Sequence, residues 1–246
     1  MQTIASGRSA DVFDLGDGRV LRRYRDDRTT HAEARLMRHL HELGYPVPLV
    51  HDADGTDLVM EHITGPTLFE ELLREPGQVD RYGRLLGDLH ERLHRIPAPD
   101  WLVGEADAGD ESGLLHDGAE ADGPQVVLHR DLHPINVILS ERGPVVIDWE
   151  GAAAGAAAID AALTVVITLG ADLEALDAET PDIRRLDASR GLLIEAFLRT
   201  CGVDPAPALG SALRLRSANP MVSEREHDWL QQHGPSCLDR FESFAD

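Results

Sequence analysis

Lysine is absent from this chain of 246 residues, so all 23 of its basic side chains are arginines. The acidic side chains number 44, which leaves a formal net charge of −21. Binding to nucleic acid requires a basic face for phosphate contacts, so we expect no nucleic-acid partner. The negative charge is compatible with a cationic ligand, although a general composition bias explains it more simply.

Cysteines and long apolar runs are also scarce. Cys201 and Cys237 are the only cysteines and lack the spacing of metal ligands, which favours a reducing compartment over a disulfide framework. No segment reaches the roughly 18 uninterrupted apolar residues that a membrane span needs. The N-terminus has no apolar signal core. These features predict a cytoplasmic protein without membrane contact, and the length suffices for one large domain or two lobes.

The first sixty residues have the pattern of a small antiparallel sheet with one helix. Ala10–Leu15 and Arg19–Tyr24 are strand-like runs joined by an Asp-Gly turn, which is a strong hairpin signal. A second hairpin is expected around Asp54 and Gly55. Between the two hairpins, a helical stripe of apolar residues runs through TTHAEARLMRHLHELG.

Beyond a Gly-Pro connector at Thr64–Thr67 the pattern is mainly helical. Helical periodicity covers Thr67–Arg74 and Val79–His94, and roughly four further helices are expected from Ala156 to the C-terminus. The segment Gly104–Gly123 holds seven acidic residues and five glycines. That composition is typical of a surface loop.

The chemistry of the chain is concentrated in QVVLHRDLHPINVIL, the stretch from Gln125 to Leu139. It contains the spacing His-Arg-Asp-Leu-x-x-x-Asn, with Asp131 and Asn136, and the next apolar strand ends on Asp148. We expect the alternation of strands and turns to bring these three residues to one edge. Two carboxylates and an amide oxygen form a hard site suited to Mg²⁺, and a carboxylate off the metal can accept a proton from a hydroxyl. This set suits phosphoryl transfer from Mg-ATP.

The sequence resembles the aminoglycoside phosphotransferase/choline kinase-like family of small-molecule kinases, which are distant relatives of protein kinases. HRDLHPIN followed by VVIDWE carries the resemblance, with Asp-Trp-Glu where protein kinases have Asp-Phe-Gly. Supporting segments are EARLMRHLHELGYPVP, DLVMEHITGPTL, LGDLHERLHRIPAP and GAAAGAAAIDAA. The resemblance implies an α+β, two-lobed, protein-kinase-like fold, with an antiparallel-sheet N-lobe at residues 1–61 and a mainly helical C-lobe at residues 62–246.

The resemblance also implies roles for individual residues. Asp131 would be the catalytic base, and Asn136 and Asp148 would bind Mg²⁺. His129 and Asp160 would brace the catalytic loop. The implied nucleotide-binding residues are Arg22, which would contact the phosphates, and Glu33, the helix carboxylate that would hold the Arg22 cation. Ser6 and Gly7 would lie in the loop over the phosphates, and Met60, Glu61 and His62 would offer backbone groups to adenine.

Two features depart from the family pattern. The third strand usually carries a lysine, and here Arg22 takes that position, while Arg23 points to the opposite face. Arginine binds phosphate bidentately and stays charged, but it is bulkier than lysine. The loop ASGRSADVF is not a G-x-G-x-x-G sequence. Only Gly7 permits close backbone approach there, with Ser6 and Ser9 as side-chain donors.

Several of these residues also fit plainer roles. Glu33 follows Thr30 at the spacing of an N-terminal capping box, and Asp160 can cap the helix after it. Another set of acidic residues either lines a pocket for a cation or is simply solvated: Glu224, Glu226, Asp228 and Asp246. A competing motif, H-E-x-x-H from His90 to His94, is typical of zinc hydrolases, but no third ligand stands out.

The sequence therefore predicts an enzyme that moves the γ-phosphoryl group of ATP or GTP to a hydroxyl of a small molecule. An aminoglycoside or related amino sugar is the leading acceptor, and antibiotic resistance would follow from it. The charge supports this acceptor class weakly, since residues after Glu61 carry −18 of the formal net charge of −21. A kinase-fold binding protein with negligible turnover is the alternative, suggested by the missing lysine, and a zinc hydrolase is third. The oligomeric state stays open.

Overall fold

The computed structural model of the protein describes residues 2–7, 9–102, 124–171, 181–220 and 222–242. The predicted acidic loop at Gly104–Gly123 lies outside these ranges. The chain is an α+β protein that divides into two compact units. Unit 1 comprises Met1–Leu68 and Ile135–Glu150, and unit 2 comprises Phe69–Pro134 and Gly151–Asp246.

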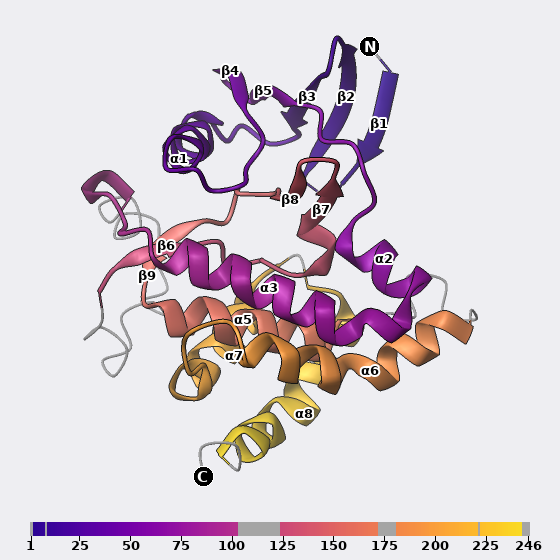
Figure 1. Ribbon diagram of the computed structural model, residues 1–246. Coiled ribbons are helices and arrows are strands. Elements are labelled where there is room, and N and C mark those ends of the chain that lie inside the picture. Colours follow the sequence, from indigo (N-terminus) through magenta and orange to yellow (C-terminus); the bar gives the residue numbers. More distant parts are fainter. Residues whose placement is uncertain (1, 8, 103–123, 172–180, 221, 243–246) are drawn as a thin grey trace. The chain divides into compact units, whose positions relative to one another are not determined.

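Unit 1 is built on a five-stranded antiparallel sheet with the strand order β1-β2-β3-β5-β4 (Figure 1). Both predicted hairpins form, β2 with β3 and β4 with β5. In the first turn Asp17 and Gly18 have φ values of 51° and 78°, as a tight hairpin turn requires. The first strand was not predicted, because its five residues are all exposed and carry no apolar alternation. The strands are β1 (Gln2–Ser6), β2 (Ala10–Gly16), β3 (Arg19–Tyr24), β4 (Val50–Asp54) and β5 (Asp57–Glu61).

The helix α1 (His31–Glu42) packs beside β4 in the same unit (Figure 1). Its buried face holds Ala34, Leu36, Met37 and Leu40, together with the carboxylate of Glu33. The helix therefore presents one charged residue on an otherwise apolar stripe.

A third hairpin, β7 (Val137–Ser140) with β8 (Gly143–Val146), also belongs to unit 1 although it comes much later in the sequence. The amide of Leu139 donates to the carbonyl of Pro66 at 2.8 Å. Gly65 permits this approach, since a Cβ there would lie 2.3 Å from the Leu139 carbonyl oxygen. The sequence places one boundary after Glu61, whereas these contacts group residues 62–68 and the hairpin with the N-terminal sheet.

Unit 2 is mainly helical, as the periodicity of the sequence predicts. The helices α3 and α6 pack closely, and α5 packs against α7 (Figure 1). Among the described residues no helix has both the length and the apolarity to cross a membrane. The elements of this part are α2 (Leu68–Arg74), α3 (Val79–His94), β6 (Val126–Leu128), β9 (Ala153–Gly155), α5 (Ala157–Gly170), α6 (Pro181–Leu198), α7 (Leu209–Ala218) and α8 (Glu224–Glu242), with short 3-10 turns at Pro76–Gln78, Pro134–Asn136 and Ala206–Ala208.

Candidate active site

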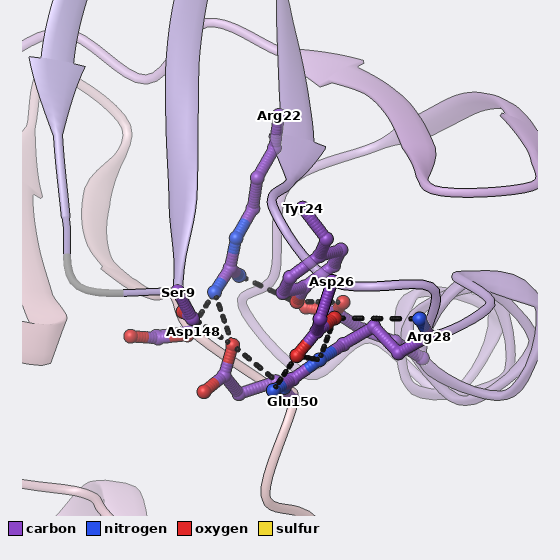
Figure 2. A network of polar contacts seen from close by, with 8 residues as sticks. Ser9, Arg22, Tyr24, Asp26, Arg28, Asp148 and Glu150 are labelled. Carbon is purple, nitrogen blue, oxygen red and sulfur yellow. Dashed lines mark hydrogen bonds and ion pairs between the residues drawn. The ribbon is translucent and has the colours of Figure 1, made fainter. Parts of the chain in front are cut away.

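Arg22 lies at the centre of a network of carboxylates in unit 1 (Figure 2). The residue is buried on β3, and its Nη1 donates to Glu33 Oε1 at 3.1 Å. Its Nη2 donates to Asp148 Oδ1 at 2.6 Å and to Glu150 Oε2 at 2.9 Å. Burial alone would lower the pKa of Arg22, but Asp148 and Glu33 raise it above its usual range. The guanidinium is therefore permanently charged.

Glu33 is positioned by tertiary contacts and takes no part in capping its helix. Its Oε2 accepts a hydrogen bond of 2.6 Å from the Tyr24 hydroxyl. Burial raises the pKa of Glu33, while Arg22 and the hydroxyl of Tyr24 oppose that rise. The predicted capping box does not form, because the Thr30 hydroxyl donates to the backbone carbonyls of Gly55 and Asp57 and makes no cap hydrogen bond. The Glu33 carboxylate is thus left for Arg22.

The two predicted metal ligands, Asn136 and Asp148, flank the open end of the β7–β8 hairpin. Val137 pairs with Val146, and the Ile147 amide donates to the Asn136 carbonyl at 3.0 Å. Asp148 therefore comes directly after Ile147, the residue whose amide is bonded to Asn136. It adopts a left-handed conformation with φ of 70°, which is uncommon outside glycine and typical of functional sites.

Trp149 anchors the segment that carries Asp148 and Glu150. Its side chain is buried, its Nε1 donates to the Val146 carbonyl at 3.0 Å, and its ring meets Tyr45 edge-on. The carboxylates on either side are held in place by this anchor.

The residues at the hairpin fit a magnesium ion. One carboxylate and one amide oxygen are hard donors, and Mg²⁺ usually takes its other ligands from water and phosphate. The Asp148 side chain is 37% exposed, so it remains accessible although Arg22 contacts its Oδ1. Within the described residues no group of three or more His, Cys, Asp or Glu side chains has a metal-binding arrangement.

The loop after β1 is held by its own side chains. Ser6 Oγ donates to Asp11 Oδ1 at 2.7 Å, and Arg25 donates to both Ser6 and the Gly7 carbonyl. Ser9 Oγ donates to Glu150 Oε2 at 3.0 Å, which connects the loop to the network of Arg22 (Figure 2).

The predicted adenine-binding residues lie at the end of β5. The amide of Glu61 donates to the Leu49 carbonyl and the amide of His62 to the Gly18 carbonyl, both at 2.8 Å. Met60 pairs with Val20 inside the sheet. The N–H groups of Glu61 and His62 are thus already used, and a base at this edge would have to meet carbonyl groups or residues further along the chain.

The predicted catalytic loop lies in unit 2, where Asp160 receives three hydrogen bonds. Its donors are the amides of His129 and Arg130, at 3.1 and 2.6 Å, and His94 Nε2 at 3.0 Å. Burial alone would raise the pKa of Asp160, but the hydrogen bond from His94 and the nearby imidazoles of His90 and His129 hold it well below its usual value. Arg130 has φ of 67°, a strained conformation that the bond to Asp160 stabilises. Asp160 is not the N-cap of α5, which is Ala156.

Asp131, the predicted base, has a donor at each carboxylate oxygen. Arg216 Nη1 lies 3.3 Å from Oδ1, and His133 Nε2 lies 3.5 Å from Oδ2. Burial would raise the pKa of Asp131, but His133 and Arg216 hold it below its usual value, so the carboxylate is ionised. Asp131 belongs to unit 2 and the pair Asn136 and Asp148 to unit 1. Their meeting at one edge stays a prediction.

The comparison with known protein families decides the identity of the chain. The family model described as the phosphotransferase enzyme family matches residues 1–111 and 105–188. The chain belongs to this family. No curated protein matches the sequence.

Solved structures of kinases share the fold of this phosphotransferase. The Plasmodium vivax ethanolamine kinase has 15% identity and a TM-score of 0.57, covering 98% of this chain and 82% of its own. The streptomycin–ATP complex of APH(2")-IIa has 17% identity and a TM-score of 0.58, with coverages of 97% and 90%. The amicoumacin kinase hAmiN, in complex with AMP-PNP, Ca²⁺ and Ami, has 14% identity and a TM-score of 0.59, with coverages of 99% and 91%. The predicted kinase-like fold is confirmed, and with the family it makes the protein a small-molecule kinase.

The H-E-x-x-H motif has a structural use in this phosphotransferase. His90 is fully buried, with Nδ1 2.9 Å from the Leu86 carbonyl oxygen and Nε2 2.8 Å from Thr164 Oγ1. His94 is bonded to Asp160. Both imidazoles thus make hydrogen bonds inside the protein, and the geometry gives no support to a zinc site formed by His90 and His94.

Three residues around the site were missed by the sequence analysis. Glu150 could have been found from the sequence, because it follows Asp148 by two residues and contacts the same side chain, Arg22. Tyr24, which bonds Glu33, lies on the same side of β3 as Arg22 and could have been found by strand alternation. Arg216 had no local signal, because 85 residues separate it from Asp131.

Proposed function

We propose that the protein transfers the γ-phosphoryl group of Mg-ATP or Mg-GTP to a hydroxyl of a small molecule, with an aminoglycoside or related amino sugar as the leading acceptor. The observation that carries the reaction type is the ionised Asp131 in a catalytic loop braced by Asp160, in a chain of the phosphotransferase enzyme family.

Asp131 acts as the base of this reaction. Its carboxylate accepts the proton of the acceptor hydroxyl, the acceptor oxygen bonds to the γ-phosphorus, and the bond from that phosphorus to the β–γ bridging oxygen breaks. The products are the phosphorylated acceptor and ADP or GDP. An ionised carboxylate is the form of Asp131 that can accept this proton, and it offers about four acceptor positions in all.

Asn136 and Asp148 hold the magnesium ion, which neutralises phosphate charge when it is bound. Arg22 supplies the cation that grips the phosphates. Both N–H groups of its Nη2 already face carboxylates, of Asp148 and Glu150. A phosphate contact through Nη2 therefore requires one of these carboxylates to give up its bond.

The acceptor class is inferred from the structural neighbours and from the charge of the chain. Streptomycin in APH(2")-IIa and the acidic residues after Glu61 support an amino sugar. Ethanolamine, named for the kinase of Plasmodium vivax, is a second amine that belongs in any acceptor test.

Thermal unfolding with ATP or GTP, each with and without Mg²⁺, tests the nucleotide site. A ligand that binds the native state raises the unfolding midpoint by mass action. We expect a rise that requires Mg²⁺, that Asp148→Asn abolishes, and that the exposed control Asp54→Asn retains. No rise with either nucleotide would mean that Arg22 does not replace the usual lysine.

Release of ADP from Mg-ATP, measured with kanamycin, gentamicin, streptomycin, ethanolamine, choline and homoserine, then tests transfer. Turnover with an amino sugar supports the proposal in full, and turnover only with another acceptor corrects the acceptor class. A nucleotide-dependent rise of the midpoint without turnover would favour a kinase-fold binding protein.

A further inference from the structure

Arg216 and Glu226 form a buried ion pair between the last two helices of unit 2. Arg216 lies in the last turn of α7 and Glu226 in the first turn of α8. Arg216 Nε donates to Glu226 Oε1 at 2.6 Å, and Nη2 donates to Oε2 at 3.1 Å. Their side chains are 16% and 8% exposed. This two-bonded fork fixes the plane of the guanidinium as well as its position.

Glu226 is itself held from two further sides. Its amide receives support from Ser223, whose Oγ accepts at 3.1 Å at the start of α8. Gly170, at the end of α5, lets α8 approach, since a Cβ there would lie 3.5 Å from Glu226 Cγ and 3.0 Å from a ring carbon of Trp229. The partner of Arg216 is therefore rigid, and its charge is not available to bind an amine.

The one nitrogen of Arg216 that Glu226 does not hold reaches the predicted base. Arg216 Nη1 lies 3.3 Å from Asp131 Oδ1. A buried ion pair is an expensive way to join two helices, because apolar side chains of similar volume often stabilise equally well. The ion pair with Glu226 already joins α7 to α8, and the contact of Arg216 with Asp131 is not needed for that purpose.

We propose that Arg216, locked by Glu226, is a positioning residue for Asp131, so that α7 and α8 form part of the machinery that orients the base toward the acceptor hydroxyl. This inference rests on the proposed function, since it assigns Arg216 through the base. Arg216 contacts the carboxylate at Oδ1 and His133 contacts it at Oδ2, so the two side chains together restrict the orientation of the carboxylate plane.

Kinetics of Arg216→Met, Arg216→Lys and Glu226→Gln test the assignment, with Arg214→Met on the exposed side of α7 as the matched control. The rate is ADP release from Mg-ATP with the best acceptor of the panel above. We expect Arg216→Met to lower kcat about 10- to 100-fold, less than the about 10²- to 10⁴-fold of a general base. The KM for ATP and the control should stay within about twofold of the wild type.

The pH profile separates positioning from a purely structural role. The groups that lower the pKa of Asp131 are the imidazole of His133, the guanidinium of Arg216 and the imidazole of His129, so removing Arg216 takes away one cation that favours the ionised base. The acidic limb of kcat should move to higher pH in Arg216→Met and stay in place in Arg216→Lys, which retains the charge. A kcat within about twofold of the wild type and an unmoved limb in Arg216→Met would overturn the inference.

A double-mutant cycle tests the contact without any acceptor. The unfolding midpoints of Arg216→Met, Asp131→Ala and the double variant are compared with the wild type. The shift of the double variant should differ from the sum of the single shifts, because residues in one network couple. Additive shifts would overturn the inference, whereas failure of the proposed function would appear separately, as absence of ADP release by the wild type.

Discussion

Arg22 serves three carboxylates at once with a side chain whose planar fork offers five N–H donors. A lysine carries its charge on one nitrogen and cannot reach Glu33, Asp148 and Glu150 with the same geometry. In this chain Arg22 therefore contacts the segment of Asp148 and Glu150 as well as Glu33 on α1. Arginine at this position therefore changes which residues are held together, and does more than preserve a positive charge.

Arg22→Lys should for this reason behave unlike a conservative change. We expect the Mg-ATP-dependent rise of the unfolding midpoint to shrink, because a point charge replaces the bidentate fork. Arg22→Met should remove the rise and destabilise the protein by about 3 kcal/mol in urea unfolding, since it leaves the buried Glu33 uncompensated. Arg23→Lys is the control, since Arg23 is exposed on the opposite face and bonded to Asp57. Equal effects of the two lysine variants would contradict the assignment of Arg22.

Asp131→Asn separates catalysis from binding. The variant keeps the shape of the side chain but cannot accept a proton, so kcat for ADP release should fall about 10²- to 10⁴-fold. The nucleotide-dependent midpoint rise should persist, because the predicted nucleotide residues are elsewhere. Asp88→Asn, at an exposed position of α3, should leave both quantities unchanged. Unchanged turnover in Asp131→Asn would show that Asp131 is not the base of the reaction.

Local spacing was enough to find Asp131, Asn136 and Asp148 as candidates, because loop chemistry of this kind is encoded within about 20 residues. It was not enough for Arg216, whose partner is remote in sequence. For Glu33 the spacing left two interpretations open, the capping box with Thr30 and the contact with Arg22, and in the structure only the contact with Arg22 forms.

At the scale of elements, the close packing of α3 against α6 depends on two glycines of α3. A Cβ at Gly83 would lie 2.5 Å from the Leu193 carbonyl oxygen, and one at Gly87 would lie 2.6 Å from that of Phe197. Both glycines are buried on α3, where alanine would be the better helix former. Close approach of the two helices outweighs this intrinsic preference.

Gly87→Ala should accordingly destabilise the protein by about 1–3 kcal/mol, the usual cost of overpacking, despite its better helix propensity. Gly191→Ala on α6 is the matched control, because a Cβ there meets no atom within 4 Å. That variant should stabilise by about 0.5–1 kcal/mol. Urea unfolding gives the change in the free energy of unfolding for each variant. A stabilising Gly87→Ala would show that the helices do not approach as described.

For the molecule as a whole, the buried His90 makes stability depend on pH. Burial lowers the pKa of His90 from 6.5 to about 4, with His94 acting in the same direction and Asp160 against it. The unfolded chain therefore takes up this proton first as the pH falls. The stabilisation is complete above pH 6.5 and is lost as the pH drops from there toward 4, by roughly 3 kcal/mol in all.

Urea unfolding at intervals between pH 7 and pH 4.5 checks this dependence. His90→Gln should give a flatter curve than the wild type over that range, whereas His41→Gln, at an exposed position of α1, should reproduce the wild-type slope. Parallel curves for the wild type and His90→Gln would mean that His90 is not held neutral in the core.

The sequence by itself determined the helices of unit 2, both hairpins of the N-terminal sheet and the reaction type, because periodicity, turn chemistry and catalytic-loop spacing are local properties. Only the tertiary structure decided which charges meet. It decided between the helix cap and Arg22 as the role of Glu33, placed the β7–β8 hairpin with the N-terminal sheet, and brought Arg216 to Asp131. The physical reason is that a buried charge needs a partner of opposite sign, and that partner is supplied by whichever element packs nearby, at any distance along the chain.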